Sequence, residues 1–414
     1  MQKALDAILS RLITRGRLTV RWPDGREQTY AGPPGSGPDA GVVLHDRWVI
    51  YRLVFNPSLA LGEAYMNGQL TPIVGSIYDL LECLILNQAQ GGAGHPFTRL
   101  GYVLGRLKRR IDQYNPAVRA QRNVAHHYDL SGRLYSLFLD HDWQYSCAYF
   151  PTGTETLEEA QTAKKRHVAA KLLLDRPGLR VLDIGCGWGG LALSLARDHN
   201  ARVLGVTLSQ EQLTAACARA AGEGLSDRVR FELRDYRAVD EKFDRIVSVG
   251  MFEHVGVNHY AQFFATAHRC LAPDGVMLLH TIGRAHGPGS TNPWIAKYIF
   301  PGGYSPALSE VMAPLERSGL YITDIEVLRL HYAETLLHWR RRFAANRDAI
   351  IAIYDERFCR MFEFYLAGSE LAFRHEGHSV FQLQIAPNQR NVPLTRDYTF
   401  DSERAMASGQ SVSA

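Results

Sequence analysis

A glycine-rich segment is the clearest place in this 414-residue chain where residue types and spacing indicate chemistry. It reads Val181-Leu-Asp-Ile-Gly-Cys-Gly-Trp-Gly-Gly190, between an apolar stretch and a segment of helical character. Glycines at 185, 187 and 189 allow a tight turn and let a ligand approach the main chain. Since Gly190 completes a G-x-G-x-x-G pattern, a dinucleotide site must be considered. Such a site predicts an acid about 20 residues further on, but residues 205–209 (GVTLS) contain none.

Asp183 precedes the first glycine by two residues and points to a different ligand. The D-x-G-x-G-x-G arrangement resembles motif I of class I methyltransferases. The resemblance implies that Asp183 orients the methionine amino group of S-adenosylmethionine, while the loop backbone and the helix N-terminus cradle the cofactor. It therefore implies cofactor contacts for Gly185, Gly187 and Gly189.

Other candidate cofactor residues follow neighbouring predicted strands. Asp235 comes directly after the stretch 229–234, where a carboxylate can accept a hydrogen bond from the adenine amino group. A turn or cap role is the alternative for Asp235. Thr207 and Gln212 stand where many class I methyltransferases keep a ribose-binding acid, so the chain departs from the general pattern there. The predicted cofactor site is completed by Tyr145, Ser146, Tyr236 and Arg237.

Seven segments together resemble cyclopropane-fatty-acid synthases and the related mycolic acid methyltransferases. The match in order and spacing covers residues 120–385, whereas the first 90 residues resemble the N-terminal lipid-binding domain of that family only loosely. The resemblance implies transfer of a methylene group from S-adenosylmethionine to the double bond of an unsaturated phospholipid acyl chain. The segments are NVAHHYDL (123–130), QYSCAYF (144–150), VLDIGCGWGG (181–190), GVTLSQEQ (205–212), FDRIVSVGMFEHVG (243–256), LLHTIG (278–283) and WIAKYIFPG (294–302).

The chemistry that the resemblance implies makes demands on the site. An alkene attacks the sulfonium methyl group and leaves a carbocation, and loss of a proton from the new methyl group closes the ring, so the site must exclude water and hold a base. In the family that base is a bound bicarbonate. Carried over to this chain, its pocket comprises Glu253, His280, Tyr332 and backbone groups near Cys147 and Ile282. A nucleophilic role for Cys147 is not expected, because the methyl group moves directly to carbon.

Alternatives remain open from the residues alone. Glu253 could be a helix-cap residue, and His280 a hydrogen-bonded core histidine. Relatives of the family also form methylene- or methyl-branched chains, or methylate small amines, with the same site residues. A nucleic-acid methyltransferase or binding module is a different class, which the basic N-terminal region would suit. Against it, the chain contains no RNA-binding signature, no zinc finger and no D/N-P-P-Y motif.

Composition is that of an ordinary globular protein, with 46% hydrophobic and 21% charged residues. No apolar run reaches the ~18 residues needed to span a bilayer, and the N-terminus lacks a signal-peptide pattern. Six cysteines without a C-x-x-C pair indicate a cytoplasmic protein with no structural metal site. Residues 1–120 carry 14 Lys+Arg against 9 Asp+Glu, a net charge of +5, whereas the whole chain has a net charge of +4. This basic N-terminal region suits peripheral contact with the inner face of a membrane. The family is often dimeric, so a homodimer is possible.

Periodicity predicts an N-terminal α+β domain over residues 1–90. It contains an amphipathic helix at 2–14, expected to dock on its own domain, and a hairpin around Pro23-Asp24-Gly25. Strand character is predicted over 42–55, followed by helices at 59–66 and 77–87. Residues 91–120, which contain a basic cluster at 106–110, are predicted to be a linker.

Strands alternate with helices from residue 160 onward, which predicts a doubly wound, Rossmann-like parallel sheet of the α/β class. The predicted strands are 180–184, 202–206, 229–234, 243–249 and 275–282. Long helices within 335–373 are expected to form a helical insertion before a last strand near 379–385. The catalytic domain is thus predicted over 121–400, with a flexible tail at 401–414.

Overall fold

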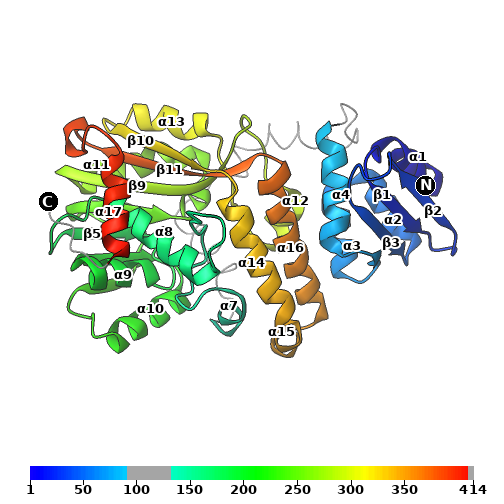
Figure 1. The fold of residues 1–414 in the computed structure, drawn as a ribbon, viewed down its shortest axis with the longest axis horizontal. Helices are drawn as coiled ribbons and strands as arrows, with labels where there is room; N and C mark the ends of the chain where they lie inside the picture. The colour runs from blue at the N-terminus through cyan, green and yellow to red at the C-terminus, as the bar shows by residue number, and fades with distance from the viewer. Residues whose placement is uncertain (91–131, 409–414) are drawn as a thin grey trace. The chain divides into compact units, whose positions relative to one another are not determined.

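The computed structural model describes residues 1–90 and 132–408, which fall into two compact units (Figure 1). The first unit combines the N-terminal residues with 289–301 and 336–378. Both of these later segments lie within the region 121–400 predicted as the catalytic domain, so the compact units cut across the predicted borders. The basic cluster at 106–110 and the segment 123–130 lie outside the described residues.

The first unit contains a four-stranded sheet with the order β2-β1-β3-β4. The predicted hairpin is confirmed, since β1 (Arg17–Arg21) and β2 (Glu27–Ala31) pair antiparallel. β3 (Asp39–Leu44) runs parallel to β1, and β4 (Leu70–Val74) antiparallel to β3. The helices of this unit are α1 (Gln2–Leu12), α2 (Arg47–Phe55), α3 (Pro57–Met66), α4 (Ile77–Gln90), α12 (Pro293–Tyr298), the later part of α14 (His331–Ala345), α15 (Arg347–Ile353) and α16 (Glu356–His375).

Two N-terminal expectations have different outcomes. The docking of the first helix on its own domain is confirmed, because Leu5 is buried in the core and Ile8 and Leu9 pack against it. The prediction of strand character through Phe55 is wrong beyond Leu44. Asp46 accepts a hydrogen bond from the backbone of Trp48 at 2.9 Å and so caps the start of α2. The apolar residues that suggested a strand instead recur at helical spacing.

The second unit contains a seven-stranded sheet with the order β10-β11-β9-β8-β5-β6-β7. Alternate residues of its strands face two separate cores: Leu182 belongs to one and Val181 to the other. Helices α11 and α13 contribute to the first core, and α8, α9 and α10 to the second. The elements are α7 (Gly132–Phe138), α8 (Leu157–Lys171), β5 (Arg180–Ile184), α9 (Gly190–His199), β6 (Arg202–Thr207), α10 (Gln210–Gly222), β7 (Val229–Leu233), β8 (Phe243–Val249), α11 (Tyr260–Cys270), β9 (Leu271–Arg284), α13 (Leu308–Glu316), β10 (Tyr321–Leu328), β11 (His378–Ala386) and α17 (Asp397–Ala407).

The end of the chain differs from the prediction in two respects. The edge strand β10, which comes next to last along the chain, was not predicted, and it pairs antiparallel with β11. Residues 401–407, expected in a flexible tail, belong to α17, which packs against α8. Across the described ranges, no helix is both long and apolar enough to cross a bilayer.

Candidate active site

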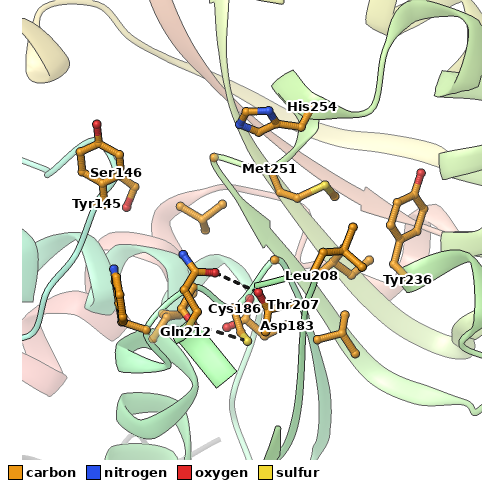
Figure 2. A pocket seen from close by; sticks show the side chains of 18 of the residues that line it. Tyr145, Ser146, Asp183, Cys186, Thr207, Leu208, Gln212, Tyr236, Met251 and His254 are labelled. Carbon is orange, nitrogen blue, oxygen red and sulfur yellow. Dashed lines mark hydrogen bonds between the residues drawn. The ribbon is translucent and has the colours of Figure 1, made fainter. Parts of the chain in front are cut away.

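A pocket lies at the carboxyl ends of the central parallel strands of the second unit (Figure 2). Carboxyl ends of adjacent parallel strands meet at one edge of a sheet, so segments far apart in the sequence converge there. Ten of the eleven residues predicted to bind the cofactor line this pocket, and Gly189 does not. The ten are Tyr145, Ser146, Asp183, Gly185, Gly187, Thr207, Gln212, Asp235, Tyr236 and Arg237.

Two of the three glycines of the loop, Gly187 and Gly189, are required for different structural reasons. Gly187 has a φ of +53°, and a Cβ there would meet no atom within 4 Å, so its missing side chain leaves room on the pocket side. Gly189 has a φ of +82°, and a Cβ there would lie 2.7 Å from the ring of Phe231 and 3.0 Å from the Cβ of Ala216. Gly189 therefore permits close packing of the loop, while Gly187 permits close approach of a ligand.

Asp183 is buried, with 2% of its surface exposed, and still lines the pocket. Its Oδ2 atom has no hydrogen-bond partner among the described residues. Burial raises the pKa of Asp183 to about 7, against the opposing charge of Lys164. A buried carboxyl oxygen without a partner is costly unless a ligand supplies one, and an ammonium group would both pair with it and ionise it.

Thr207 and Gln212 form a hydrogen-bonded pair, with the hydroxyl donating to the amide oxygen at 2.9 Å. The amide nitrogen of Gln212 remains a possible donor to a ligand hydroxyl. Elsewhere in the pocket lining, Arg237 binds both carboxylate oxygens of Asp235, at 2.8 and 2.6 Å. Burial would raise the pKa of Asp235, but the hydrogen bonds from Arg237 outweigh it and hold the pKa below its ordinary value.

The residues predicted to surround bicarbonate do not line this pocket, although their chain neighbours Ser146, Gly250, Met251 and His254 do. Glu253 lies in a 3₁₀ turn, Phe252–His254, after β8. Its Oε1 accepts a hydrogen bond from the backbone N–H of Ile282, so these two predicted residues are in contact. Its Oε2 is buried without a partner among the described residues, and burial raises the pKa of Glu253 to about 7.

His280 lies on β9, and its carbonyl oxygen accepts a hydrogen bond from Gly250 at 2.9 Å. The side chain of Gln382 fixes its ring: Lys171, which has only donors, points its ammonium at the amide oxygen (2.7 Å), so the amide nitrogen faces Nδ1 of His280 (3.1 Å). The neutral ring then carries its proton on Nε2. Burial, reinforced by Lys164 and Lys171, lowers the pKa of His280 well below its ordinary value, which favours this neutral form.

A hydrogen bond joins the segment that contains Cys147 to helix α14, which carries Tyr332. The N–H of Ala148 donates to the hydroxyl of Thr335 at 3.0 Å, and Thr335 lies one turn after Tyr332 on α14. Cys147 is buried, its thiol donates to the carbonyl of Ala148 at 3.2 Å, and burial raises its pKa far above the ordinary value. A thiol held in the protonated form is a poor nucleophile, which agrees with a backbone role for this segment.

The family model for mycolic acid cyclopropane synthetase matches residues 116–383, and a domain of unknown function matches residues 4–91. The chain is 40% identical to the cyclopropane-fatty-acyl-phospholipid synthase of Escherichia coli over 359 residues, which covers 86% of this chain and 90% of that one. This chain belongs to the mycolic acid cyclopropane synthetase family. It is also 39% identical to a probable fatty acid methyltransferase of Pseudomonas putida, over 88% of this chain and 92% of the relative.

Solved structures of family members agree with the fold. The cyclopropane synthase MmaA2 of Mycobacterium tuberculosis and the mycolic acid cyclopropane synthase CmaA1, the latter in complex with SAH and CTAB, each superpose with a TM-score of 0.61 at 37% identity. Each match covers 66% of this chain and 99% of the solved chain. The predicted class I methyltransferase fold is thereby confirmed, and the chain is an S-adenosylmethionine-dependent methyltransferase of this family.

Two residues near the pocket were not found from the sequence. His254 lines the pocket, and burial lowers its pKa to about 4. Lys164 is fully buried, donates to the side chains of Gln144 and Ser146, and has its pKa lowered by burial to about 8. The available signal was the position of Lys164 on the same helical face as Leu157, Gln161 and Val168, where a lysine is unexpected.

Proposed function

We propose that this enzyme transfers the methyl group of S-adenosylmethionine to the double bond of an unsaturated acyl chain of a membrane phospholipid and closes a cyclopropane ring. The observation that carries the proposal is the alignment with a cyclopropane-fatty-acyl-phospholipid synthase along 86% of this chain and 90% of that protein. The mycolic acid synthases align with 64% of this chain. The relative whose name specifies a phospholipid is therefore among those that match this chain well beyond the length shared with the mycolic acid synthase.

The residues of the pocket suit the first step of this reaction. Gly185 and Gly187 give a ligand access to the backbone, and the free oxygen of Asp183 suits the ammonium of S-adenosylmethionine. Tyr145, Tyr236 and Trp188 contribute aromatic rings to the lining, whose faces suit a sulfonium or a carbocation. A cation held among rings and away from water is less exposed to capture by water.

The residues around Glu253 fit a bound bicarbonate, the base that we propose for the second step. Glu253 with a pKa of about 7 can keep a proton, and its partnerless Oε2 can then donate a hydrogen bond to an anion rather than repel it. His280, with its proton on Nε2, is a second neutral donor. Bicarbonate bound there would supply the proton acceptor. Glu253 and His280 orient it, and we assign Tyr332 and the backbone at Cys147 and Ile282 to the same pocket.

Lipid analysis tests the proposal. Membrane lipids of a host that expresses the chain should gain the mass of one CH2 group, and fragmentation should locate a ring at the former double bond. A branched product is the second candidate, because the chain is also 41% identical to the tuberculostearic acid methyltransferase of M. tuberculosis over 64% of each chain. A branch in place of a ring would select that candidate, and unchanged lipids would exclude both.

A further inference from the structure

Helix α2 exposes three aromatic side chains on one side. Trp48, Tyr51 and Phe55 are 71%, 44% and 57% exposed, and their spacing of three and four residues puts them on one helix face. The opposite face carries Val49, Ile50 and Val54, which are buried in the core of the first unit. Packing into the core therefore accounts for one face of α2, and the exposed aromatic side chains lie on the other face. Exposed residues of this size are the kind that mark an interaction surface.

Two arginines, Arg47 and Arg52, lie beside the aromatic face. Arg47, at the start of α2, is exposed and has no ion-pair partner among the described residues. Arg52 lies on the aromatic side, and its side chain stays 41% exposed although it pairs with Glu63. Asp46, which precedes Arg47, accepts a hydrogen bond from the backbone of Trp48 as the cap of the helix. Aromatic rings interspersed with arginine complement a layer of anionic phosphates above acyl chains.

The size of the face distinguishes a membrane from a protein partner. Aromatic side chains bury about 150–250 Å² each, so the exposed parts of these three offer roughly 350 Å². A stable protein–protein interface needs about 800 Å² per partner. The face is too small to hold a second copy of this chain by itself, whereas a few side chains inserted at the headgroup level suffice for reversible contact with a bilayer.

We propose that the α2 face, defined by Trp48, Tyr51, Phe55 and Arg47, docks the enzyme on an anionic phospholipid surface. The inference rests on the proposed function, since an acyl-chain substrate lies within a bilayer. The alternative within the same unit is α1, whose apolar side is already packed into the core around Leu5. The face is apolar at its centre and cationic at its edge, so lipid charge should strengthen docking without being its sole source.

Vesicle pelleting tests the inference without requiring activity. The probes are two kinds of vesicle made from saturated lipids, which contain no double bond. One kind mixes phosphatidylglycerol with phosphatidylcholine, and the other contains phosphatidylcholine alone. Trp48→Ser/Phe55→Ser in the full chain should bind mixed vesicles at least tenfold more weakly than the wild type. The matched control Tyr321→Ser/Leu394→Ser removes two exposed apolar side chains elsewhere, 52% and 102% exposed, and should bind as the wild type does.

Several results would overturn the inference. They are equal vesicle binding by the α2 variant and the wild type, no vesicle binding by the wild type, and equal losses in both double variants. A shift of the α2 variant from dimer to monomer in size-exclusion chromatography, with vesicle binding intact, would assign the face to a second copy. Detergent-dispersed unsaturated phospholipid separates the two proposals: the α2 variant should methylate it at the wild-type rate. A wild type that binds the saturated vesicles but does not methylate the dispersed unsaturated phospholipid would refute the proposed function alone.

Discussion

Two buried acids at the same edge of the sheet have similar properties and different surroundings. Asp183 is the last residue but one of β5, and Glu253 follows β8, a directly neighbouring strand. Burial raises the pKa of each to about 7, and each has one carboxyl oxygen without a partner among the described residues. Asp183 lines the pocket, whereas Glu253 does not. The other carboxyl oxygen of Glu253 accepts a hydrogen bond from the backbone N–H of Ile282.

We propose that the two acids use the same physical state for two functions. An acid that opens onto a pocket and is easily ionised suits a cationic ligand, which pulls its pKa down on binding. An acid that stays protonated suits an anion, to which it can donate. We therefore assign Asp183 to the ammonium of S-adenosylmethionine and Glu253 to bicarbonate, and substitution of each should affect a different step.

The largest expected effect follows from substitution of Glu253. Glu253→Gln keeps the shape and a donor but removes the carboxyl group, so a misplaced base should lower turnover by about 10²-fold or more. Binding of S-adenosylmethionine, measured by calorimetry, should stay as in the wild type because the glycine loop is unchanged. Glu223→Gln, which alters a surface ion pair with Arg197, is the control. Near-wild-type turnover by Glu253→Gln would remove this residue from the mechanism.

A second effect separates cofactor binding from chemistry. Gly187→Val places a branched side chain on the pocket side, so affinity for S-adenosylmethionine should fall at least tenfold, ~1.4 kcal/mol. Gly224→Val is a matched control, because Gly224 also has a positive φ (+67°) and open space around it but does not line the pocket. Equal losses in both variants would mean that backbone strain, not obstruction of the pocket, causes the effect.

A smaller effect is expected from the ring orientation of His280. Gln382→Glu replaces the donor at Nδ1 with an acceptor, so Nδ1 must donate and the neutral ring loses its Nε2 proton. We expect kcat to fall roughly tenfold, with the KM for S-adenosylmethionine unchanged. Nitrogen NMR of His280 should report the change of tautomer. An unchanged tautomer with lowered kcat would indicate a purely structural role for Gln382.

The smallest expected effect is the release of a proton when S-adenosylmethionine binds. At pH ~6 the free enzyme holds Asp183 largely protonated, because its folded pKa is about 7. An ammonium ligand should ionise it, so binding of S-adenosylmethionine should release up to about one proton. Calorimetry in two buffers of different ionisation enthalpy measures this number. Release should vanish in Asp183→Asn and persist in Glu253→Gln. The reverse pattern would exchange the roles of the two acids.

The lining of the pocket was largely predictable from the sequence because its core is contiguous. Asp183, Gly185 and Gly187 stand together in one strand–turn–helix motif, whose geometry follows from glycine and from helix termini. The strands at 180–184 and 243–249 were predicted to the residue, since both are short apolar runs between clear turn signals. Gly189 shows the limit: its spacing is that of a ligand-binding glycine, but its contacts with Phe231 and Ala216 are structural.

The remaining features depend on contacts that no local pattern records. Lys164, Lys171 and Gln382 are buried polar residues whose partners lie 18 to 211 positions away. The sequence predicts a strand at α2 because its β-branched and aromatic residues favour one. The segment forms a helix instead, and Asp46 caps its start. The homodimer and the cytoplasmic location stay predictions, since no observation on this chain bears on them.

Turnover in the absence of dissolved carbonate tests the assignment of the second step most directly. The wild-type enzyme, with saturating S-adenosylmethionine and unsaturated phospholipid, is assayed in buffer stripped of carbon dioxide and again after bicarbonate is restored. A bound bicarbonate base predicts that turnover falls on removal and returns on addition, while Glu253→Gln responds weakly or not at all. Full wild-type turnover in carbonate-free buffer would contradict the mechanism and require a base from the chain itself.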